Sequence, residues 1–250
     1  MKTICVIPSR YGSTRLAAKP LALLHGRPMV AWVVDVARGV PEFDEVIVAT
    51  DHEEIASAAR AAGVEAVLTD PDLPSGTDRV HAAMAGREAD VVVNLQGDEP
   101  VMPAEALSRA HRALLADARF DIATACVPIF DRATFDNPMV VKVVRDAANR
   151  ALFFSRSPIP SASRRPDADG LGTTTPWGFK HLGIYLYKRD ALERFVTLAP
   201  SPLERVECLE QLRALEAGMT FVCVDSPADS VSVDVAEDLE RAAAQLRPKG

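Results

Sequence analysis

Hydrophobic and polar positions alternate along the first half of the chain in blocks that predict strands and helices in turn. Short apolar runs predict buried strands at residues 4–7, 45–50, 65–69 and 91–95. Amphipathic segments between them predict helices at residues 28–38, 51–63, about 78–87 and 103–117, the second with Asp51 as its N-cap. Strands and helices at this spacing form βαβ units. We therefore expect an α/β fold, with an open, mostly parallel twisted sheet flanked by helices in a Rossmann-like arrangement.

The second half of the chain is less regular and predicts a smaller mixed α+β portion. Strand-like runs occupy residues 122–129, 140–144, 151–155, 180–188, 221–224 and 230–233. Helical patterns occupy residues 190–198, 202–216 and 235–246. The apolar stripe of the second helix indicates either core or a dimer interface, and it consists of Leu203, Val206, Leu209, Leu212 and Leu215. A segment rich in Pro, Ser and Gly, residues 158–178, is equally consistent with a mobile lid, a subunit contact or a passive surface loop.

Residues 8–20, PSRYGSTRLAAKP, form a predicted loop that leaves the first strand at its carboxyl end. Open α/β sheets bind their ligands at this end. Backbone N–H groups near Gly12 can approach an anion closely, and Arg10, Arg15 and Lys19 can neutralise it, which indicates a binding site for a phosphate chain. The pattern matches neither a Walker loop nor Gly-x-Gly-x-x-Gly, and a solvated basic loop is the alternative.

Composition limits the classes of function that remain. Of the chain's 250 residues, 48% are hydrophobic, which is ample for a core. The net charge of −7 and the pI of about 5.3 argue against nucleic-acid binding. No apolar run is long enough for membrane insertion, and the first residues do not resemble a signal peptide, so we expect a cytoplasmic protein. The four scattered cysteines form no C-x-x-C pair and are interpreted as inert core thiols.

Asp98 follows a hydrophobic strand and Gly97, and it would face the basic loop. A carboxylate there would repel bound phosphates unless a cation intervened, and Mg²⁺ takes carboxylate and phosphate oxygens together. Asp234, after the short apolar run 231–233, is the best second carboxylate. Each has a structural alternative: Asp98 as a turn former, and Asp234 as the N-cap of an Asp-x-x-Glu capping pattern.

Short motifs follow one another along nearly the whole chain: PSRYGSTRL with KPL at residues 8–21, ATD at 49–51, SGTDR at 75–79, QGDEP at 96–100, NP with VKVV at 137–144, FSR at 154–156, HLGIY at 181–185, SPLE at 201–204 and LEQL at 209–212. Together and in this order they resemble the 3-deoxy-manno-octulosonate (Kdo) cytidylyltransferase family, also called CMP-Kdo synthetases. The resemblance implies a nucleotidyltransferase that converts CTP and Kdo into CMP-Kdo and diphosphate. It also implies Mg²⁺ dependence, a cytoplasmic homodimer and a role in lipopolysaccharide biosynthesis.

The resemblance divides the chain into two halves of a single domain over residues 1–250. The nucleotide-binding half covers about residues 1–130, and the sugar-binding and dimerisation half covers residues 131–250. The residues expected to be catalytic are Arg10, Arg15, Lys19, Asp98 and Asp234, the two aspartates as Mg²⁺ ligands. The residues expected to bind the nucleotide are Pro8, Ser9, Arg10, Ser13, Lys19, Ser75, Gly76 and Gln96. The residues expected around the sugar acid are Gln96, Arg156, His181, Tyr185, Glu210 and Gln211.

The sugar's anomeric hydroxyl would attack the α-phosphorus of CTP, with positioning and charge neutralisation as the protein's main tasks. Arg156 would suit the sugar carboxylate because a guanidinium fork matches its two oxygens. His181 would either act as a base or hydrogen-bond sugar hydroxyls.

The sequence also departs from the family pattern, and rival functions stay open. The family commonly has Pro-Gly where this chain has Ala17-Ala18, and Thr-Pro where Val235-Ala236 follow Asp234. Residues 160–177 match poorly. Three rivals are a CMP-synthetase for another sugar acid (sialic-acid-like or 8-amino-Kdo), a metal-dependent glycosyltransferase, and a non-catalytic nucleotide-sugar sensor. The glycosyltransferase usually carries Asp-x-Asp, which Gln96-Gly97-Asp98 is not.

Overall fold

The computed structural model describes residues 1–12, 16, 18–161 and 175–246. The strands of its main sheet are β1 (Thr3–Ser9), β4 (Glu45–Thr50), β5 (Glu65–Leu68), β6 (Val91–Leu95), β7 (Ile122–Ile129), β8 (Lys142–Arg145), β9 (Ala151–Ser155), β10 (Gly178–Lys188) and β11 (Phe221–Asp225). A separate small hairpin pairs β2 (Leu23–Leu24) with β3 (Arg27–Pro28). The helices are a 3-10 turn η1 (Lys19–Leu21), α1 (Met29–Arg38), α2 (Glu53–Ala61), α3 (Gly76–Ala83), α4 (Ala104–Ala116), α5 (Arg132–Asp136), α6 (Arg189–Thr197), α7 (Pro202–Glu207), α8 (Gln211–Glu216) and α9 (Ala236–Gln245).

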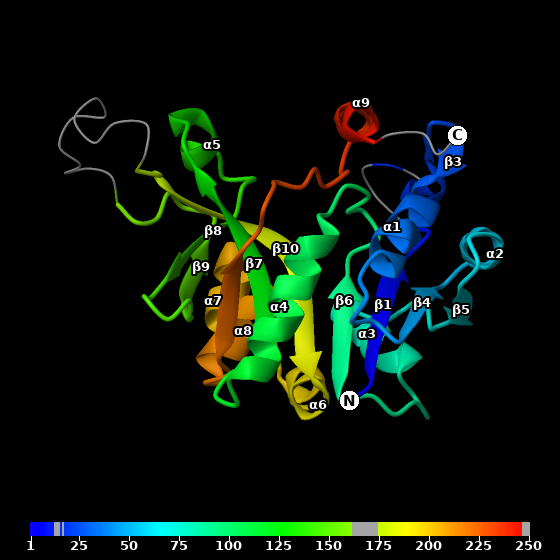
Figure 1. Cartoon of the computed structure of the whole chain (residues 1–250), viewed down its shortest axis with the longest axis horizontal. Helices are drawn as coiled ribbons and strands as arrows, with labels where there is room; N and C mark the ends of the chain where they lie inside the picture. Colours follow the sequence, from blue (N-terminus) through cyan, green and yellow to red (C-terminus); the bar gives the residue numbers. More distant parts are fainter. Residues whose placement is uncertain (13–15, 17, 162–174, 247–250) are drawn as a thin grey trace.

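The sheet runs in the order β11-β7-β10-β6-β1-β4-β5 within the described residues, with β8 attached to β10 and β9 to β8 (Figure 1). β1 pairs in parallel with both β4 and β6, β4 with β5, and β7 with β11. β10 runs antiparallel between β6 and β7. The expected α/β class is therefore confirmed, and β10 with β8 and β9 forms the mixed portion that the irregular second half predicted.

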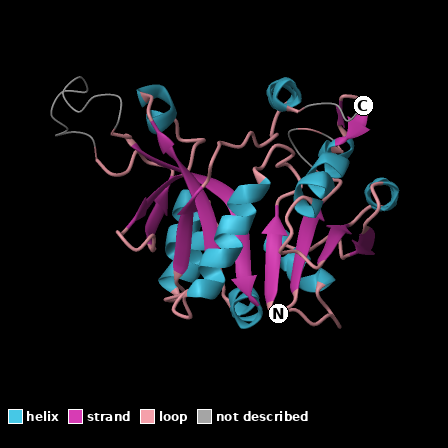
Figure 2. Cartoon of the chain, viewed as in Figure 1, coloured by secondary structure: helices cyan, strands magenta, loops and turns pink. Residues whose placement is uncertain are grey.

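Helices cover both faces of the sheet, which is why the central strands are apolar on both sides (Figure 2). Side chains alternate across β1 because strand residues point to opposite faces in turn. Cys5 and Ile7 pack in a core cluster that includes α1, α2 and α4. Ile4 and Val6 pack in a second cluster that includes α3, α6 and α8. Both faces of the strand that starts the phosphate loop are thus fixed by packing.

The predicted helix over residues 202–216 is wrong as a single element. It divides into α7 and α8 at Cys208, whose backbone is left-handed with φ of 52°. The break also divides the apolar stripe: Val206 is 81% exposed, while Leu209 and Leu212 are buried. Cys208 is itself exposed, so the core-thiol interpretation holds for Cys5, Cys126 and Cys223 and is wrong for Cys208.

Two predicted helix N-caps and one predicted short strand are also wrong, because the side chains involved contact distant parts of the chain. His52, not Asp51, is the N-cap of α2, and its Nδ1 accepts the Glu54 N–H at 3.3 Å. Residues 230–233 form no strand and run as an irregular segment. Val235, not Asp234, is the N-cap of α9, and the Asp238 carboxylate accepts the Asp234 N–H at 2.8 Å.

Two further expectations, on membrane crossing and on the segment rich in Pro, Ser and Gly, can be compared only with the part of the chain that the structure describes. No helix in the described ranges combines the length and apolar character that a membrane crossing requires. Most of the segment interpreted as lid, subunit contact or surface loop, residues 162–174, lies outside the described residues.

Candidate active site

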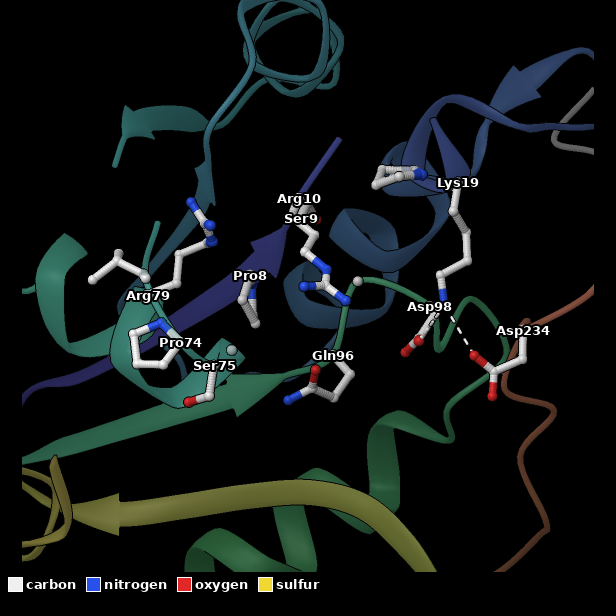
Figure 3. Close-up of a pocket in the computed structure, with 14 residues that line it drawn as sticks. Pro8, Ser9, Arg10, Lys19, Pro74, Ser75, Arg79, Gln96, Asp98 and Asp234 are labelled. Carbon is white, nitrogen blue, oxygen red and sulfur yellow. Dashed lines mark hydrogen bonds and ion pairs between the residues drawn. The ribbon is translucent and has the colours of Figure 1, made fainter. Parts of the chain in front are cut away.

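A cavity of about 290 Å³ opens at the carboxyl ends of β1 and β6, where the strand-end rule predicted the ligand (Figure 3). Its wall is lined by Pro8, Ser9, Arg10, Lys19, Pro20, Leu73, Pro74, Ser75, Gly76, Arg79, Gln96, Gly97, Asp98 and Asp234. The structure thereby gathers all the described residues expected to contact the nucleotide, together with both expected metal ligands. Ser13 and Arg15 lie outside the described residues.

Lys19 joins the two aspartates at one end of this cavity. Its Nζ donates to Asp98 Oδ2 at 2.6 Å and to Asp234 Oδ1 at 3.2 Å (Figure 3). Lys19 stands on η1, Asp98 follows β6, and Asp234 precedes α9. The Asp234 carboxylate therefore faces the cavity and not the first turn of the helix, which the N-cap alternative required. An ammonium shared by two carboxylates leaves an excess of negative charge that favours a further cation.

Two contacts hold the Asp234 segment against the end of β6. The Val233 N–H donates to the Asp98 carbonyl at 2.9 Å. The Ser230 hydroxyl donates to Glu99 Oε2, and Glu99 is only 6% exposed. Burial, reinforced by neighbouring Asp98, raises the pKa of Glu99 to about 7. These contacts replace the β pairing that the sequence predicted for residues 230–233.

The donor set of Asp98 and Asp234 is compatible with Mg²⁺ but does not make a complete protein cage. The described part of the chain contains no group of three or more His, Cys, Asp or Glu side chains that could hold a metal ion. Mg²⁺ is usually bound through one or two carboxylates together with substrate phosphates and water. The two carboxylates, already close enough to share one ammonium, fit that arrangement.

Arg79 is a cavity residue that the list of expected site residues omitted. It comes from α3 and is only 3% exposed. Its Nη1 donates to Thr69 Oγ1 at 2.5 Å and its Nη2 lies 3.7 Å from Asp51 Oδ2. Asp51 in turn accepts the Tyr11 N–H at 2.8 Å, which ties the phosphate loop to this pair. Burial lowers the pKa of Arg79. The sequence contained a signal for this pair: Asp51 directly follows β4 and Arg79 lies near the start of α3, so opposite charges meet at one edge of the sheet.

The start of α3 forms the opposite wall of the cavity. Ser75 is its N-cap, accepts the Asp78 N–H at 3.2 Å and donates to Asp78 Oδ2 at 2.7 Å. A Cβ on Gly76 would lie 3.4 Å from Gln96 Oε1, so the helix start packs directly on the Gln96 amide. Ser75, Gly76 and Gln96 thus form one surface, as expected for residues that share a ligand.

The residues expected around the sugar acid lie largely outside the lining of this cavity. Gln96 lines the cavity, whereas Arg156, His181, Tyr185, Glu210 and Gln211 do not. His181 and Tyr185 lie with ring centroids 5.6 Å apart, and burial, with a further contribution from Glu210, raises the pKa of Tyr185. Gln211 is buried in the first turn of α8.

Arg156 is engaged with the protein's own backbone. Its guanidinium donates to the carbonyls of Glu207, Pro138 and Cys208 at 2.8, 3.2 and 3.4 Å. The fork that was expected to meet a sugar carboxylate therefore has other acceptors in this structure. Its role toward a sugar stays a prediction.

His181 is buried beside aromatic rings and a hydroxyl. Its Nε2 lies 2.8 Å from Thr124 Oγ1, and its ring meets Phe154 edge-on at 4.8 Å. Burial lowers the pKa of His181 to about 3, so the imidazole is neutral at physiological pH. A neutral ring of such low basicity suits hydrogen bonding better than proton abstraction.

Comparison with known proteins decides the family. The cytidylyltransferase family model matches residues 4–221. This chain belongs to the cytidylyltransferase family. It is therefore a nucleotidyltransferase, and the family resemblance of the sequence motifs is confirmed.

Individual relatives of this cytidylyltransferase are similar over their full length. The 3-deoxy-manno-octulosonate cytidylyltransferase of Bdellovibrio bacteriovorus is 42% identical over 254 residues and covers 100% of both chains. That of Acinetobacter baumannii is 43% identical over 244 residues, with 94% of each chain covered. A solved structure of CMP:2-keto-3-deoxy-manno-octonic acid synthetase complexed with CTP superposes with a TM-score of 0.89 at 38% identity, covering 98% of each chain.

A more distant solved structure shows how far the fold extends. A cytidylyltransferase from Leptospira borgpetersenii superposes with a TM-score of 0.63 at 17% identity, over 98% of this chain and 86% of that one. At this identity the similarity concerns the fold alone.

We expect Gly97→Ala to force apart the carboxyl ends of β1 and β6. A Cβ on Gly97 would meet Ser9 Oγ and stand 2.7 Å from the Pro8 carbonyl oxygen, and backbone cannot move aside cheaply. The free energy of unfolding should fall by about 1–3 kcal/mol, as for other overpacked sites. Urea unfolding measures this loss. Gly183→Ala is the matched control, since its Cβ would find only an ordinary contact at 3.9 Å with Glu99 Oε1. An equal effect of the two substitutions would contradict the close approach.

We expect His181 to make stability depend on pH in acid. Its pKa is about 3 when folded and about 6.5 when unfolded, so between these values the unfolded chain binds one more proton. This stability is complete above about pH 6.5 and is lost as the pH falls toward 3, by up to ~1.4 kcal/mol per pH unit. His181→Gln should flatten the curve of unfolding free energy between pH 6 and 4, relative to wild type and to His81→Gln on α3. Parallel curves for His181→Gln and wild type would disprove a buried neutral imidazole.

Proposed function

We propose that this enzyme transfers a cytidylyl group from CTP to Kdo, giving CMP-Kdo and diphosphate. The observation that carries the proposal is the cavity with Lys19 between Asp98 and Asp234, on a fold that superposes at TM-score 0.89 on a synthetase complexed with CTP. Full-length relatives that are 42–43% identical carry the name of this activity. From the family resemblance alone we also propose Mg²⁺ dependence and a cytoplasmic homodimer that serves lipopolysaccharide biosynthesis.

In this proposal the nucleotide occupies the cavity. The cytosine lies against Pro8, Ser9, Ser75 and Gly76, and the phosphates lie toward Arg10 and Lys19. Ser13 and Arg15, which belong to the same loop, complete the phosphate contacts. The buried Arg79 guanidinium adds positive charge to the wall, and Asp51 fixes its position. These residues bind and orient the triphosphate and stabilise charge on the departing diphosphate.

Kdo is placed next to the nucleotide on the side of Gln96, His181, Tyr185, Glu210 and Gln211, with Arg156 at the edge of this set. The anomeric hydroxyl attacks the α-phosphorus and releases its proton to solvent, an O–P bond forms, and the bond to the bridging oxygen of the diphosphate breaks, so that diphosphate leaves with the electron pair. Mg²⁺ held by Asp98 and Asp234 would supply charge neutralisation and a lower pKa for the attacking hydroxyl. The neutral His181 imidazole orients sugar hydroxyls by hydrogen bonding.

The first test of the proposal measures diphosphate release from CTP and Mg²⁺ with Kdo, with sialic acid or with no sugar. Release with Kdo alone is the expected result, and EDTA should abolish it reversibly. Release only with another sugar acid would support cytidylyl transfer but would show that the substrate is not Kdo. CTP binding without release for any sugar would favour the nucleotide-sugar sensor.

We expect Asp98→Asn to lower turnover by a factor on the order of 10² or more while the fold persists, since a neutral amide offers Lys19 and a metal ion a much weaker partner. Steady-state diphosphate release and thermal unfolding measure the two effects. Asp190→Asn, at an exposed aspartate on α6, is the control for an equivalent loss of charge away from the cavity. Undiminished turnover in Asp98→Asn would remove Asp98 from the catalytic residues.

A further inference from the structure

A chain of hydrogen-bonded side chains leads from the cavity wall into the protein. Gln96 Nε2 donates to Asn94 Oδ1 at 2.8 Å, and Asn94 Nδ2 donates to Thr77 Oγ1 at 3.3 Å. Thr77 Oγ1 then donates to Glu210 Oε2 at 2.8 Å. We call Gln96, Asn94, Thr77 and Glu210 the polar chain. It connects a residue of the nucleotide cavity to one expected beside the sugar acid.

The two inner members of the polar chain, Asn94 and Thr77, occupy buried positions of a kind usually filled by apolar side chains. Asn94 is fully buried on β6, among the valines and the leucine of that strand, and Thr77 is 1% exposed. Asn94 and Gln96 are two positions apart, so both side chains lie on the face of β6 that α3 covers. A buried amide without partners would cost several kcal/mol, and here every step has one. A satisfied network of this kind fixes one arrangement of its members.

The direction of donation fixes how the Gln96 amide is turned. Each member donates to the next, and the last acceptor is a carboxylate. If the Gln96 amide turned over, its oxygen would face the Asn94 oxygen and the hydrogen bond would be lost. Gln96 therefore keeps Nε2 on Asn94 and keeps Oε1 for another donor, and Figure 3 shows its side chain within the cavity between Ser75 and Asp98.

The other end of the polar chain leaves an acceptor as well. Glu210 stands at the start of α8 and uses Oε2 for Thr77. Its Oε1 is buried and accepts no hydrogen bond of good geometry from the described residues, with Arg213 Nη2 at 3.9 Å. The Ser75 hydroxyl interacts with Glu210 and opposes the rise in the Glu210 pKa that burial causes, but it donates to Asp78 Oδ2 at 2.7 Å. An acceptor held in this way suits a hydroxyl group of a ligand, because burial without a donor is unfavourable.

We propose that Asn94 and Thr77 are positioning residues that hold Gln96 Oε1 toward a donor group of the ligand in the cavity and Glu210 Oε1 toward a hydroxyl of the second substrate. The inference deepens the proposed function, on which it rests. One network thereby sets the relative orientation of the nucleotide and the polyhydroxylated acid. Neither Asn94 nor Thr77 lines the cavity.

The test compares Thr77→Val, Thr77→Ser and Thr3→Val. Thr77→Val keeps the shape but breaks the polar chain, and Thr77→Ser restores the hydroxyl. Thr3→Val is the matched control, since Thr3 is also 1% exposed and its hydroxyl is also 2.8 Å from a side-chain partner, His111 Nε2. We expect Thr77→Val to lower kcat/KM for the sugar acid by at least about tenfold, the loss typical of a hydrogen bond to a charged group. Thr77→Ser should recover most of it, and Thr3→Val should change only the melting temperature.

A purely structural role for the polar chain predicts a different result. Thr77→Val and Thr3→Val would then lower the melting temperature alike and leave kcat/KM alike, which would overturn the proposal. A second comparison uses the Gln96→Leu background. If Thr77 acts in part through Gln96, Thr77→Val should lower kcat/KM less there than in wild type, because the two side chains belong to one network. Full additivity would also count against the proposal.

Failure of the proposed function can be told apart from failure of this inference. If wild type releases no diphosphate with any sugar acid, the activity proposal fails, and the polar chain is judged by NMR of the Gln96 side-chain amide. Its ¹H and ¹⁵N signals should be displaced from solvent-exposed values and slow to exchange in wild type and Thr77→Ser. In Asn94→Leu they should move to exposed values. Unchanged Gln96 signals in Asn94→Leu would refute the positioning role whatever the enzyme's substrate.

Discussion

The cavity depends on one interaction, the Lys19 ammonium held between the carboxylates of Asp98 and Asp234. These residues are separated by 79 and 215 positions from Lys19, so no local preference brings them together. Two unit charges 4 Å apart interact by roughly 4 kcal/mol at an effective dielectric constant of 20, and the same size of repulsion would act between neighbouring carboxylates left without a cation. Lys19 therefore makes the pairing possible. An irregular segment with no strand partner can hold Asp234 at the sheet edge because Lys19, the Val233–Asp98 backbone bond and the Ser230–Glu99 contact all attach it there.

The strand β6 serves the site in two ways. Its carboxyl end delivers Asp98 to the charged end of the cavity, after Gly97 has allowed β6 to approach β1 closely. Its α3-facing side carries Asn94 and Gln96, which turn an otherwise apolar strand face into the start of the polar chain. Charge and orientation are thus supplied by residues near the end of one rigid strand or directly after it. A site built on a strand end of this kind keeps its geometry better than one built on a loop.

The local sequence pattern was sufficient to predict an element wherever the side chains of a run serve only to pack in the core. The apolar runs of β1, β4 and β6 predicted the parallel half of the sheet, and charge reasoning at the strand ends predicted that Asp98 and Asp234 meet. Prediction failed where a distant partner overrode the local pattern. Asp51 has the sequence of a helix cap, but it is used by Tyr11 and Arg79. The apolar stripe from Leu203 to Leu215 predicts one helix, but the left-handed backbone at Cys208 divides that helix into α7 and α8. Asn94 was visible as a polar residue in an apolar run, but its partner Thr77 lies 17 positions away, and Thr77 binds Glu210 at a separation of 133.

The charges around the cavity also constrain what must enter with a nucleotide. Arg79 is already offset by Asp51, and Lys19 is outnumbered by its two carboxylates, which leaves the exposed Arg10 as the remaining cationic side chain among the described cavity residues. One guanidinium cannot balance a triphosphate that also approaches Asp98 and Asp234. We propose that the missing positive charge comes from Arg15 and from a cation that arrives with the phosphates. If a divalent ion takes over the two carboxylates, Lys19 is released toward the phosphate chain. In this proposal the ammonium that joins the two carboxylates before binding would become one of the groups that stabilise the departing diphosphate.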